Sequence, residues 1–221
     1  MSAQTADAIA VQPPGLFIAL EGGEGAGKST HAQKLCGWLR GRGREVVLTR
    51  EPGGSPLAEA IRAIVLGNWD EGIDATTEAL LMFAARAAHV HAVIAPALAQ
   101  RKVVICDRFV DASFAYQGAA RGLGTARIAQ LEQLTLNGLR PDLVLLLDLD
   151  PAIGLARAHS RGGANRFEAE TARFMALVRE AYLERARAAP ERYAVIDASR
   201  SPEEVGAAIQ TAVDSVLERS R

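Results

Sequence analysis

Residues 16–30 read LFIALEGGEGAGKST, and this stretch decides the fold. An apolar run of strand type ends in a G-x-x-x-x-G-K-S match over residues 22–29, and a helix-like segment follows over residues 30–40. The glycine-rich turn points backbone N–H groups at a polyphosphate, and the following helix adds its positive N-terminal end. In such a loop Lys28 reaches the β and γ phosphates and Ser29 ligates Mg²⁺. A merely structural turn is the alternative, which the strand context and the Lys-Ser pair disfavour.

The candidate nucleotide-binding residues of this phosphate loop are therefore Gly22, Gly23, Glu24, Gly25, Ala26, Gly27, Lys28, Ser29 and Thr30.

Composition bounds the class of protein. The chain has 221 residues, of which 49% are hydrophobic and 23% charged, and this predicts a compact α/β domain that needs no disulfide. The formal net charge of -1 argues against broad nucleic-acid or membrane binding, which usually shows as a basic surface. Two cysteines, Cys36 and Cys106, suit a reducing compartment.

The first 15 residues are small and polar, so we expect a flexible leader over 1–15 and a single domain over 16–221. The leader lacks the basic region and apolar core of a signal peptide, and we expect no apolar stretch of bilayer-spanning length. These features predict a cytoplasmic protein.

Four further apolar segments are predicted as buried strands, namely 45–49, 102–106, 143–149 and 193–196. The intervening segments show helical spacing. We expect core-facing stripes formed by Leu57, Ile61, Ile64 and Val65 in one helix, and by Leu80, Phe83, Ala87, Val90 and Ile94 in a longer helix over 76–100. The sequence Ser201-Pro202-Glu203-Glu204 is a capping box that starts a final helix.

Five apolar strands separated by helices predict an α/β fold of the P-loop NTPase type, a five-stranded parallel sheet with helices on both faces. Ligands in such sheets bind beyond the carboxyl ends of the strands. The first three strands end at the phosphate loop, at Arg50-Glu51-Pro52 and at Asp107-Arg108. We therefore expect these three polar clusters to converge on one rim.

A phosphate loop leaves the reaction open, because kinases, switch GTPases and transport ATPases all use it. A switch GTPase would carry an Asn-Lys-x-Asp loop, yet no asparagine of this chain precedes lysine. The Ser-Gly-Gly-Gln signature of transporter ATPases is also absent. Of these classes of phosphate-loop protein, a small phosphotransferase is the one that remains.

From about Leu16 to the C-terminus the chain resembles the thymidylate kinase family, and in particular its bacterial branch, in which the lid supplies the basic groups. The matching segments, in order, are 21–30, 49–54, 81–86, 107–109, 115–118 and Arg161-Gly162 followed by 165–168. The resemblance implies transfer of the γ-phosphoryl group from Mg-ATP to dTMP, giving dTDP and ADP, and a homodimer. Asn165 and Ala112 depart from the pattern, where many relatives have aspartate and serine.

The resemblance also implies roles for acceptor-site residues. Glu24 contacts the sugar 3′-hydroxyl, although a solvated loop acid is the alternative. Phe83 stacks on thymine and Arg86 donates to its ring oxygen. The two lie three apart on the predicted helix, so they share a neighbouring surface; Phe83 alone could equally be a core residue. Arg50 and Arg108, just past strand ends, bind the 5′-phosphate of dTMP. Ser113, Tyr116 and Gln117 lie near the sugar and base, with a structural aromatic as the alternative for Tyr116.

On the donor side, Asp107 and Ser29 are the predicted Mg²⁺ residues, with a capping or salt-bridged Asp107 as the alternative. The predicted lid is 157–168, in which Arg161 and Arg166, backed by Arg157, bind the transferring phosphoryl group; a solvated basic loop is the alternative. Lys28, Arg108, Arg161 and Asp107 are the predicted catalytic residues.

His89 and His91 are interpreted as ordinary helix residues, because residues two apart do not share a helix face and no cysteine or carboxylate completes a metal-binding set.

Two alternative functions stay open at this stage. The nearer one is a kinase for another nucleotide or nucleoside, such as dCMP or dUMP. The other is a nucleotide-dependent switch or assembly ATPase that transfers nothing to a small acceptor.

Overall fold

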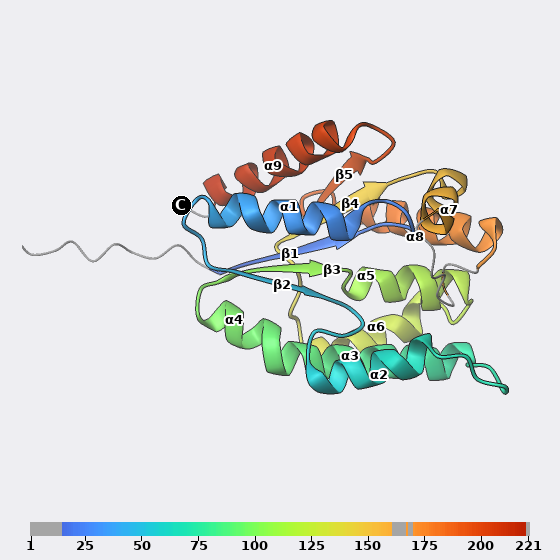
Figure 1. The fold of residues 1–221 in the computed structure, drawn as a ribbon. Coiled ribbons are helices and arrows are strands. Elements are labelled where there is room, and N and C mark those ends of the chain that lie inside the picture. Colours follow the sequence, from blue (N-terminus) through green and yellow to red (C-terminus); the bar gives the residue numbers. More distant parts are fainter. Residues whose placement is uncertain (1–14, 161–166, 168–169, 220–221) are drawn as a thin grey trace, which may run out of the picture.

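The computed structural model describes residues 15–160, 167 and 170–219. Within them a five-stranded parallel sheet has the order β2-β3-β1-β4-β5, which confirms the predicted fold class (Figure 1). The strands are β1 (Leu16–Glu21), β2 (Val46–Arg50), β3 (Val103–Asp107), β4 (Leu143–Asp148) and β5 (Tyr193–Asp197). Each lies within two residues of its predicted range. The expected leader lies, apart from Gly15, outside the described residues.

Helices connect the strands and cover both faces of the sheet (Figure 1). They are α1 (Lys28–Arg40), α2 (Pro56–Leu66), α3 (Ala75–His89), α4 (Ala95–Ala99), α5 (Val110–Ser113), α6 (Thr125–Leu136), α7 (Pro151–His159), α8 (Ala172–Ala188) and α9 (Pro202–Arg219). Two segments are π-helical, η1 (Val90–Ile94) and η2 (Phe114–Ala120). The predicted capping box starts α9, because Ser201 N donates to Glu204 and Glu204 N donates to Ser201 Oγ.

The central strand β1 contributes side chains to two hydrophobic cores, one on each face of the sheet. Leu16, Ile18 and Leu20 pack with residues of α1 and α9, whereas Phe17 and Ala19 pack with residues of α3 and α4 on the other face. Successive side chains of a strand point to opposite faces, so a strand buried on both sides reads as a continuous apolar run. This explains why residues 16–20 show no polar alternation.

The register of the parallel strands β1, β2 and β3 brings the three predicted polar clusters to the same edge of the sheet. In the parallel ladders Asp107 is the partner of both Leu20 and Arg50, so β1, β2 and β3 end at the same level. The phosphate loop, the segment after Arg50 and the segment after Asp107 therefore share one rim, as expected from the sequence.

The long helix predicted over 76–100 is present as α3, η1 and α4 in succession, with a wide π-helical turn in its middle. Contrary to expectation, this helix is long and apolar enough by composition alone to span a bilayer. One face of this helix nevertheless packs on the sheet. Phe83 and Ile94 pack against β1 and β3, and the charged side chain of Arg86 is only 1% exposed inside the protein.

The predicted stripes are partly wrong. Leu57 and Ile64 of α2 and Leu80 of α3 are exposed, whereas Ile61 and Val65 face the core as expected. The physical reason is that α2 packs on α3 at the edge of the molecule, so only a narrow stripe of it is covered (Figure 1). Periodicity alone does not distinguish that stripe from its neighbours.

The phosphate loop touches α7 backbone to backbone. Gly25 has φ of 71°, and a Cβ there would lie 2.1 Å from the carbonyl oxygen of Gly154 in α7. Conversely, a Cβ on Gly154 would lie 2.3 Å from the carbonyl oxygen of Glu24. Neither backbone atom can move aside cheaply, so a glycine in the middle of α7 fixes the position of the loop.

This contact generates a stability prediction. On helix propensity alone Gly154→Ala would stabilise the protein by about 1 kcal/mol. We expect the opposite, a loss of about 1–3 kcal/mol in the free energy of unfolding, because the new methyl group overlaps the loop backbone. Denaturant unfolding measures this. Gly206→Ala in α9 is the matched control, since a Cβ there meets nothing within 4 Å, and it is expected to stabilise. Equal effects of the two substitutions would contradict the packing argument.

Candidate active site

A cavity of about 270 Å³ lies at the shared rim of β1, β2 and β3. Its lining combines the phosphate loop with residues from after β2, from α2 and α3, and from after β3. These residues are Glu24, Gly25, Gly27, Lys28, Ser29, Thr30, Arg50, Glu51, Pro52, Arg62, Leu66, Met82, Asp107, Arg108, Ala112, Tyr116, Gln117 and Phe167. Most of the side chains predicted from the sequence are therefore brought together.

Lys28 and Ser29 lie at the base of the cavity. Lys28 Nζ donates to the carbonyl oxygen of Gly23 at 2.7 Å, and burial, with a smaller effect of the nearby Arg108 charge, lowers the pKa of Lys28 to about 8. Ser29 Oγ donates to Asp107 Oδ2 at 2.5 Å. A hydroxyl and a carboxylate from two elements thus meet at the loop, and this hard-oxygen donor set fits Mg²⁺.

Arg108 is held by acceptors from three parts of the chain. Its Nη2 donates to Glu24 Oε1 at 2.6 Å, and its Nη1 donates to the Gly22 carbonyl oxygen at 3.1 Å and to the Tyr182 hydroxyl at 3.3 Å. Its backbone has φ of 68°, which is unusual for a residue other than glycine and marks a constrained position. The Tyr116 hydroxyl also donates to Glu24 Oε1, at 3.1 Å. Glu24, Arg108 and Tyr116 thus form one cluster at the cavity wall.

Arg50 lies at the rim, half exposed, where its Nη2 donates to Glu59 Oε2 at 2.9 Å. A third arginine of the cavity wall, Arg62 in α2, donates to the Pro52 carbonyl oxygen at 2.7 Å. Sequence reasoning missed Arg62. The signal was a lone arginine within an otherwise apolar helical stripe, which needs a polar partner or solvent.

The predicted role of Phe83 needs correction, whereas that of Arg86 stays a prediction. Phe83 and Arg86 are neighbours, with the Arg86 guanidinium carbon 4.7 Å from the centre of the Phe83 ring, but neither side chain lines the cavity. Phe83 belongs to the core between α3 and the sheet. Met82 lines the cavity instead. One residue along a helix turns the side chain by about 100°, so a stripe containing Phe83 faces the sheet and a stripe containing Met82 faces the cavity.

Arg86 is buried and uses three of its five N–H donors within the protein. Its Nε donates to Glu51 Oε2 at 2.6 Å, its Nη1 to Ser113 Oγ at 3.0 Å and its Nη2 to the Phe109 carbonyl oxygen at 3.0 Å. Ser113, predicted near the substrate, is fully buried behind the cavity as one of these acceptors. Ser113 therefore helps to hold the Arg86 guanidinium, and Arg86 in turn holds Glu51, which lines the cavity.

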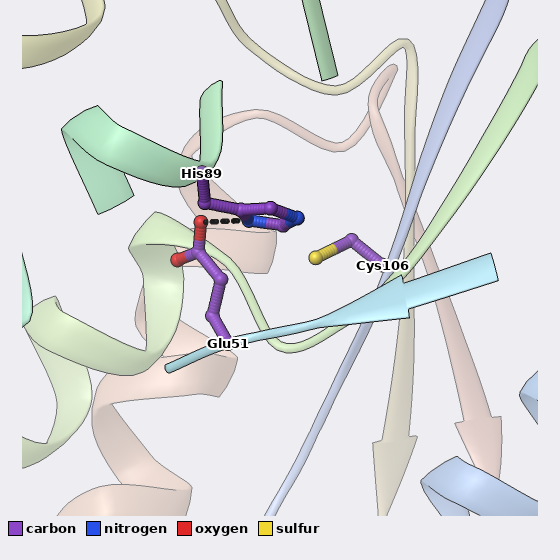
Figure 2. A group of neighbouring side chains, drawn as sticks. All are labelled: Glu51, His89 and Cys106. Atoms are coloured by element: carbon purple, nitrogen blue, oxygen red, sulfur yellow. Dashed lines mark hydrogen bonds and ion pairs between the residues drawn. The ribbon is translucent and has the colours of Figure 1, made fainter. Parts of the chain in front are cut away.

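His89 is also part of this support, which corrects its interpretation as an ordinary helix residue without a cysteine or carboxylate nearby. Figure 2 shows its ring between Glu51 and Cys106, with ligand-type atoms of all three within 4.8 Å of one another. Its Nδ1 lies 3.0 Å from Glu51 Oε1, and its Nε2 lies 2.7 Å from Thr49 Oγ1. Because Glu51 also binds Arg86, these groups already satisfy one another as a hydrogen-bond network.

Gln117 lies in η2, where its side chain is 1% exposed and lines the cavity. Its Nε2 donates to the buried carboxylate of Glu78 in α3 at 2.7 Å. Sequence reasoning placed Gln117 near the base but missed Glu78. The signal was the spacing of Glu78, Met82 and Arg86, which lie four apart and therefore share one helix face.

The predicted lid is only partly within the described residues. Arg157, at the end of α7, donates to the Ala198 carbonyl oxygen at 3.1 Å, and Phe167 lines the cavity. Arg161 and Arg166 lie outside the described residues.

The phosphate loop, the Ser29–Asp107 pair and the arginines around one cavity define a phosphotransferase of the P-loop class. The family model for thymidylate kinase matches residues 20–209 of the chain. Thymidylate kinases of Pseudomonas putida and Ectopseudomonas mendocina are each 56% identical to it over 207 residues, covering 94% of this chain and 99% of theirs. The crystal structure of thymidylate kinase from Ehrlichia chaffeensis matches with a TM-score of 0.75 at 31% identity, covering 91% of this chain and 99% of that one.

The chain therefore belongs to the thymidylate kinase family, and it is a nucleoside monophosphate kinase.

Glu21, beneath the phosphate loop, generates a prediction on pH and stability. Its carboxylate is fully buried and accepts from Phe109 N at 2.7 Å and from the Tyr182 hydroxyl at 2.8 Å. Burial, with a smaller effect of the Asp111 charge, raises the pKa of Glu21 from 4.5 to about 7. The folded state therefore binds this proton more tightly than the unfolded chain. The resulting stabilisation is complete below about pH 4.5 and is lost as the pH rises towards 7.

Glu21→Gln removes this titration. We expect its stability relative to the wild type to improve by about 2 kcal/mol between pH 5 and pH 8, measured by denaturant unfolding. Glu45→Gln, at an exposed carboxylate, is the control for replacing a glutamate by glutamine. Parallel pH curves for Glu21→Gln and the wild type would refute the assignment.

Proposed function

We propose that the protein transfers the γ-phosphoryl group of Mg-ATP to the 5′-phosphate of dTMP, giving dTDP and ADP. The observation that carries this proposal is that the phosphate loop and the guanidinium of Arg108 face one cavity. A phosphate monoester has a second pKa of about 6, so the attacking oxygen is already largely ionised at neutral pH and no dedicated general base is needed. Catalysis then rests on position and charge.

On the donor side, the loop N–H groups and Lys28 bind the triphosphate. Lys28 gives up its bond to the Gly23 carbonyl oxygen, and the arriving phosphate charge favours its protonated form. Ser29 and Asp107 would hold Mg²⁺, which neutralises charge on the phosphates. Arg161 and Arg166 of the predicted lid complete this side as part of the proposal.

On the acceptor side, Arg108 and Arg50 bind the 5′-phosphate of dTMP, with Arg62 as a third cation of the wall. Glu24 and Tyr116 lie beside Arg108, which supports their proposed contact with the deoxyribose. The base packs on Met82 and reaches Gln117. Met82 takes the place that the sequence assigned to Phe83, and Arg86 remains proposed to donate to the ring oxygen of thymine, because its hydrogen bonds within the described residues use three of its five N–H donors.

We also infer a cytoplasmic homodimer. Leu57 and Ile64 support the dimer, because they lie seven residues apart on one face of α2 and leave apolar side chains exposed. The cytoplasm is inferred because the proposed substrates are small free nucleotides and because the two cysteines are unpaired, as in a reducing compartment.

The reaction is tested by a coupled assay of ADP release with dTMP, dUMP, dCMP and thymidine as acceptors. We expect turnover to depend on an acceptor and to be fastest with dTMP. Lys28→Ala is expected to lower kcat by about 100-fold or more, because a cation facing the transferred group is lost. Its circular dichroism spectrum and Tm should stay close to those of the wild type. Acceptor-independent ATP hydrolysis, or near-normal turnover of Lys28→Ala, would contradict the proposal.

The dimer is tested by light scattering coupled to size-exclusion chromatography. The wild type is expected at twice the chain mass of 23.5 kDa, and Ile64→Glu at the mass of one chain. A charge at an apolar interface is costly, whereas a charge on a free surface is not. Ile153→Glu on α7 is the matched control, since Ile153 is 42% exposed and Ile64 is 43% exposed. A wild type that elutes as a single chain, or an Ile64→Glu variant that remains a dimer, would overturn this interface.

A further inference from the structure

Glu21 and Tyr182 are two buried polar residues to which the proposed reaction gives no role. Glu21 ends β1 and is fully buried, and Tyr182 in α8 is 1% exposed. Neither side chain lines the cavity. A buried carboxylate is costly unless other groups hold it, so its contacts indicate what it is used for. The contacts of both residues are with Arg108 and with its neighbour in the chain.

Tyr182 joins Glu21 to the guanidinium of Arg108. Its hydroxyl donates to Glu21 Oε2 at 2.8 Å and accepts from Arg108 Nη1 at 3.3 Å. Burial, with a smaller effect of the Glu21 charge, raises the pKa of the Tyr182 hydroxyl well above its usual value, so the hydroxyl keeps its proton. An ionised carboxylate accepts hydrogen bonds and donates none. Glu21 therefore turns the hydroxyl hydrogen towards itself and leaves an oxygen lone pair for Arg108.

Glu21 also holds the main chain that carries Arg108. Its second oxygen, Oε1, accepts from the backbone N–H of Phe109 at 2.7 Å. Arg108 has φ of 68°, in the left-handed region that residues other than glycine rarely adopt. A backbone in that region persists only where the surrounding contacts determine it. One carboxylate thus restrains both the main chain next to Arg108 and the hydroxyl to which its guanidinium donates.

The guanidinium of Arg108 has an anchored nitrogen and an exchangeable one. Nη1 donates to Tyr182 and to the Gly22 carbonyl oxygen at 3.1 Å, and neither of these residues lines the cavity. Nη2 donates to Glu24, which does line it. An arriving phosphate can therefore replace Glu24 at Nη2 while the contacts at Nη1 stay in place.

We propose that Tyr182, oriented by Glu21, is a positioning residue that anchors Nη1 of Arg108 and so presents Nη2 to the 5′-phosphate of the acceptor nucleotide. This inference rests on the proposed function and deepens it. A guanidinium that is already held binds phosphate more tightly than one that must first be ordered, because ordering a long side chain costs entropy. The effect falls on the acceptor nucleotide, since Lys28 and the loop N–H groups bind the donor phosphates.

The test is a double-mutant cycle on nucleotide binding. Kd values for dTMP and for Mg-ADP are measured by titration calorimetry with the wild type, Tyr182→Phe, Arg108→Ala and the double variant. The measurements are made at pH 8, where Glu21, with a pKa of about 7, is ionised. We expect Tyr182→Phe to raise the Kd for dTMP by about 5–10-fold, the value of one hydrogen bond to a charged group, and to change that for Mg-ADP by less than about 2-fold.

The cycle separates positioning from a general loss of structure. In the Arg108→Ala background, Tyr182→Phe is expected to change the Kd for dTMP by less than about 2-fold, because no guanidinium is left to position. Tyr193→Phe is the matched control. Tyr193 also donates its hydroxyl to a carboxylate, at 2.8 Å from Asp111 Oδ1, but the hydrogen bonds of Arg108 within the described residues do not include it. Its dTMP affinity should match the wild type.

Glu21→Gln keeps the test decisive if Tyr182→Phe does not fold. The amide carbonyl must face the N–H of Phe109, so the NH₂ group faces the Tyr182 hydroxyl and donates to it. The hydroxyl hydrogen is then displaced towards Arg108, and the anchor of Nη1 is lost. We expect the Kd for dTMP to rise by about 5–10-fold here too, although this variant gains stability relative to the wild type as the pH rises. A merely structural role of Glu21 does not give weaker binding together with higher relative stability.

The outcomes distinguish this inference from the proposed function. An unchanged Kd for dTMP in folded Tyr182→Phe, an equal loss for dTMP and Mg-ADP, or the same loss with and without Arg108 would overturn the inference. A wild type that fails to bind dTMP, or an Arg108→Ala variant that binds it as tightly as the wild type, would refute the proposed function and this inference together. Binding of dTMP that depends on Arg108 and not on Tyr182 would refute the inference alone.

Discussion

The carboxyl edge of the sheet buries several charged side chains, and each has a partner of opposite charge or a set of hydrogen bonds from another element. Glu51 holds Arg86, Arg121 faces Glu78, and Tyr182 binds Glu21. An isolated buried charge costs several kcal/mol, so each pair can form only if its elements sit at the correct distance. The pairing therefore links α3 to the end of β2 and to the end of η2, and links α8 to the end of β1.

The same constraint prepares the cavity for anions. Lys28 and Arg108, proposed to bind phosphate, each have a protein acceptor in the structure, namely the Gly23 carbonyl oxygen and Glu24. An arriving phosphate replaces these oxygen acceptors with others, so the cations need little reorganisation. Because Glu24 is a neighbour of both Arg108 and Tyr116, release of Arg108 towards a phosphate also changes the hydrogen bonding of the sugar-side wall.

The parts of the structure that local chemistry dictates could be predicted from the sequence. The strand, phosphate loop and first helix, the five strands and the capping box of α9 all follow from residues close together in the chain. The α3 residue that faces the cavity could not, because Phe83 and Met82 are adjacent apolar residues and only the position of the sheet distinguishes them. Glu78 and His89 were missed for a related reason. Their partners Gln117 and Glu51 are distant in sequence, and the four-residue spacing that puts Glu78 on one face with Met82 and Arg86 does not show that this face is buried.

One face of α3 consequently connects two residues of the cavity lining, Gln117 in η2 and Glu51 after β2. Glu78, Met82, Arg86 and His89 are all buried and recur at intervals of four, four and three residues, so they form a single stripe along a rigid helix. Glu78 holds Gln117 at one end, and Arg86 and His89 hold Glu51, just after β2, at the other. A helix keeps these separations constant, as a loop would not, so α3 fixes the distance between the Gln117 amide and the end of β2.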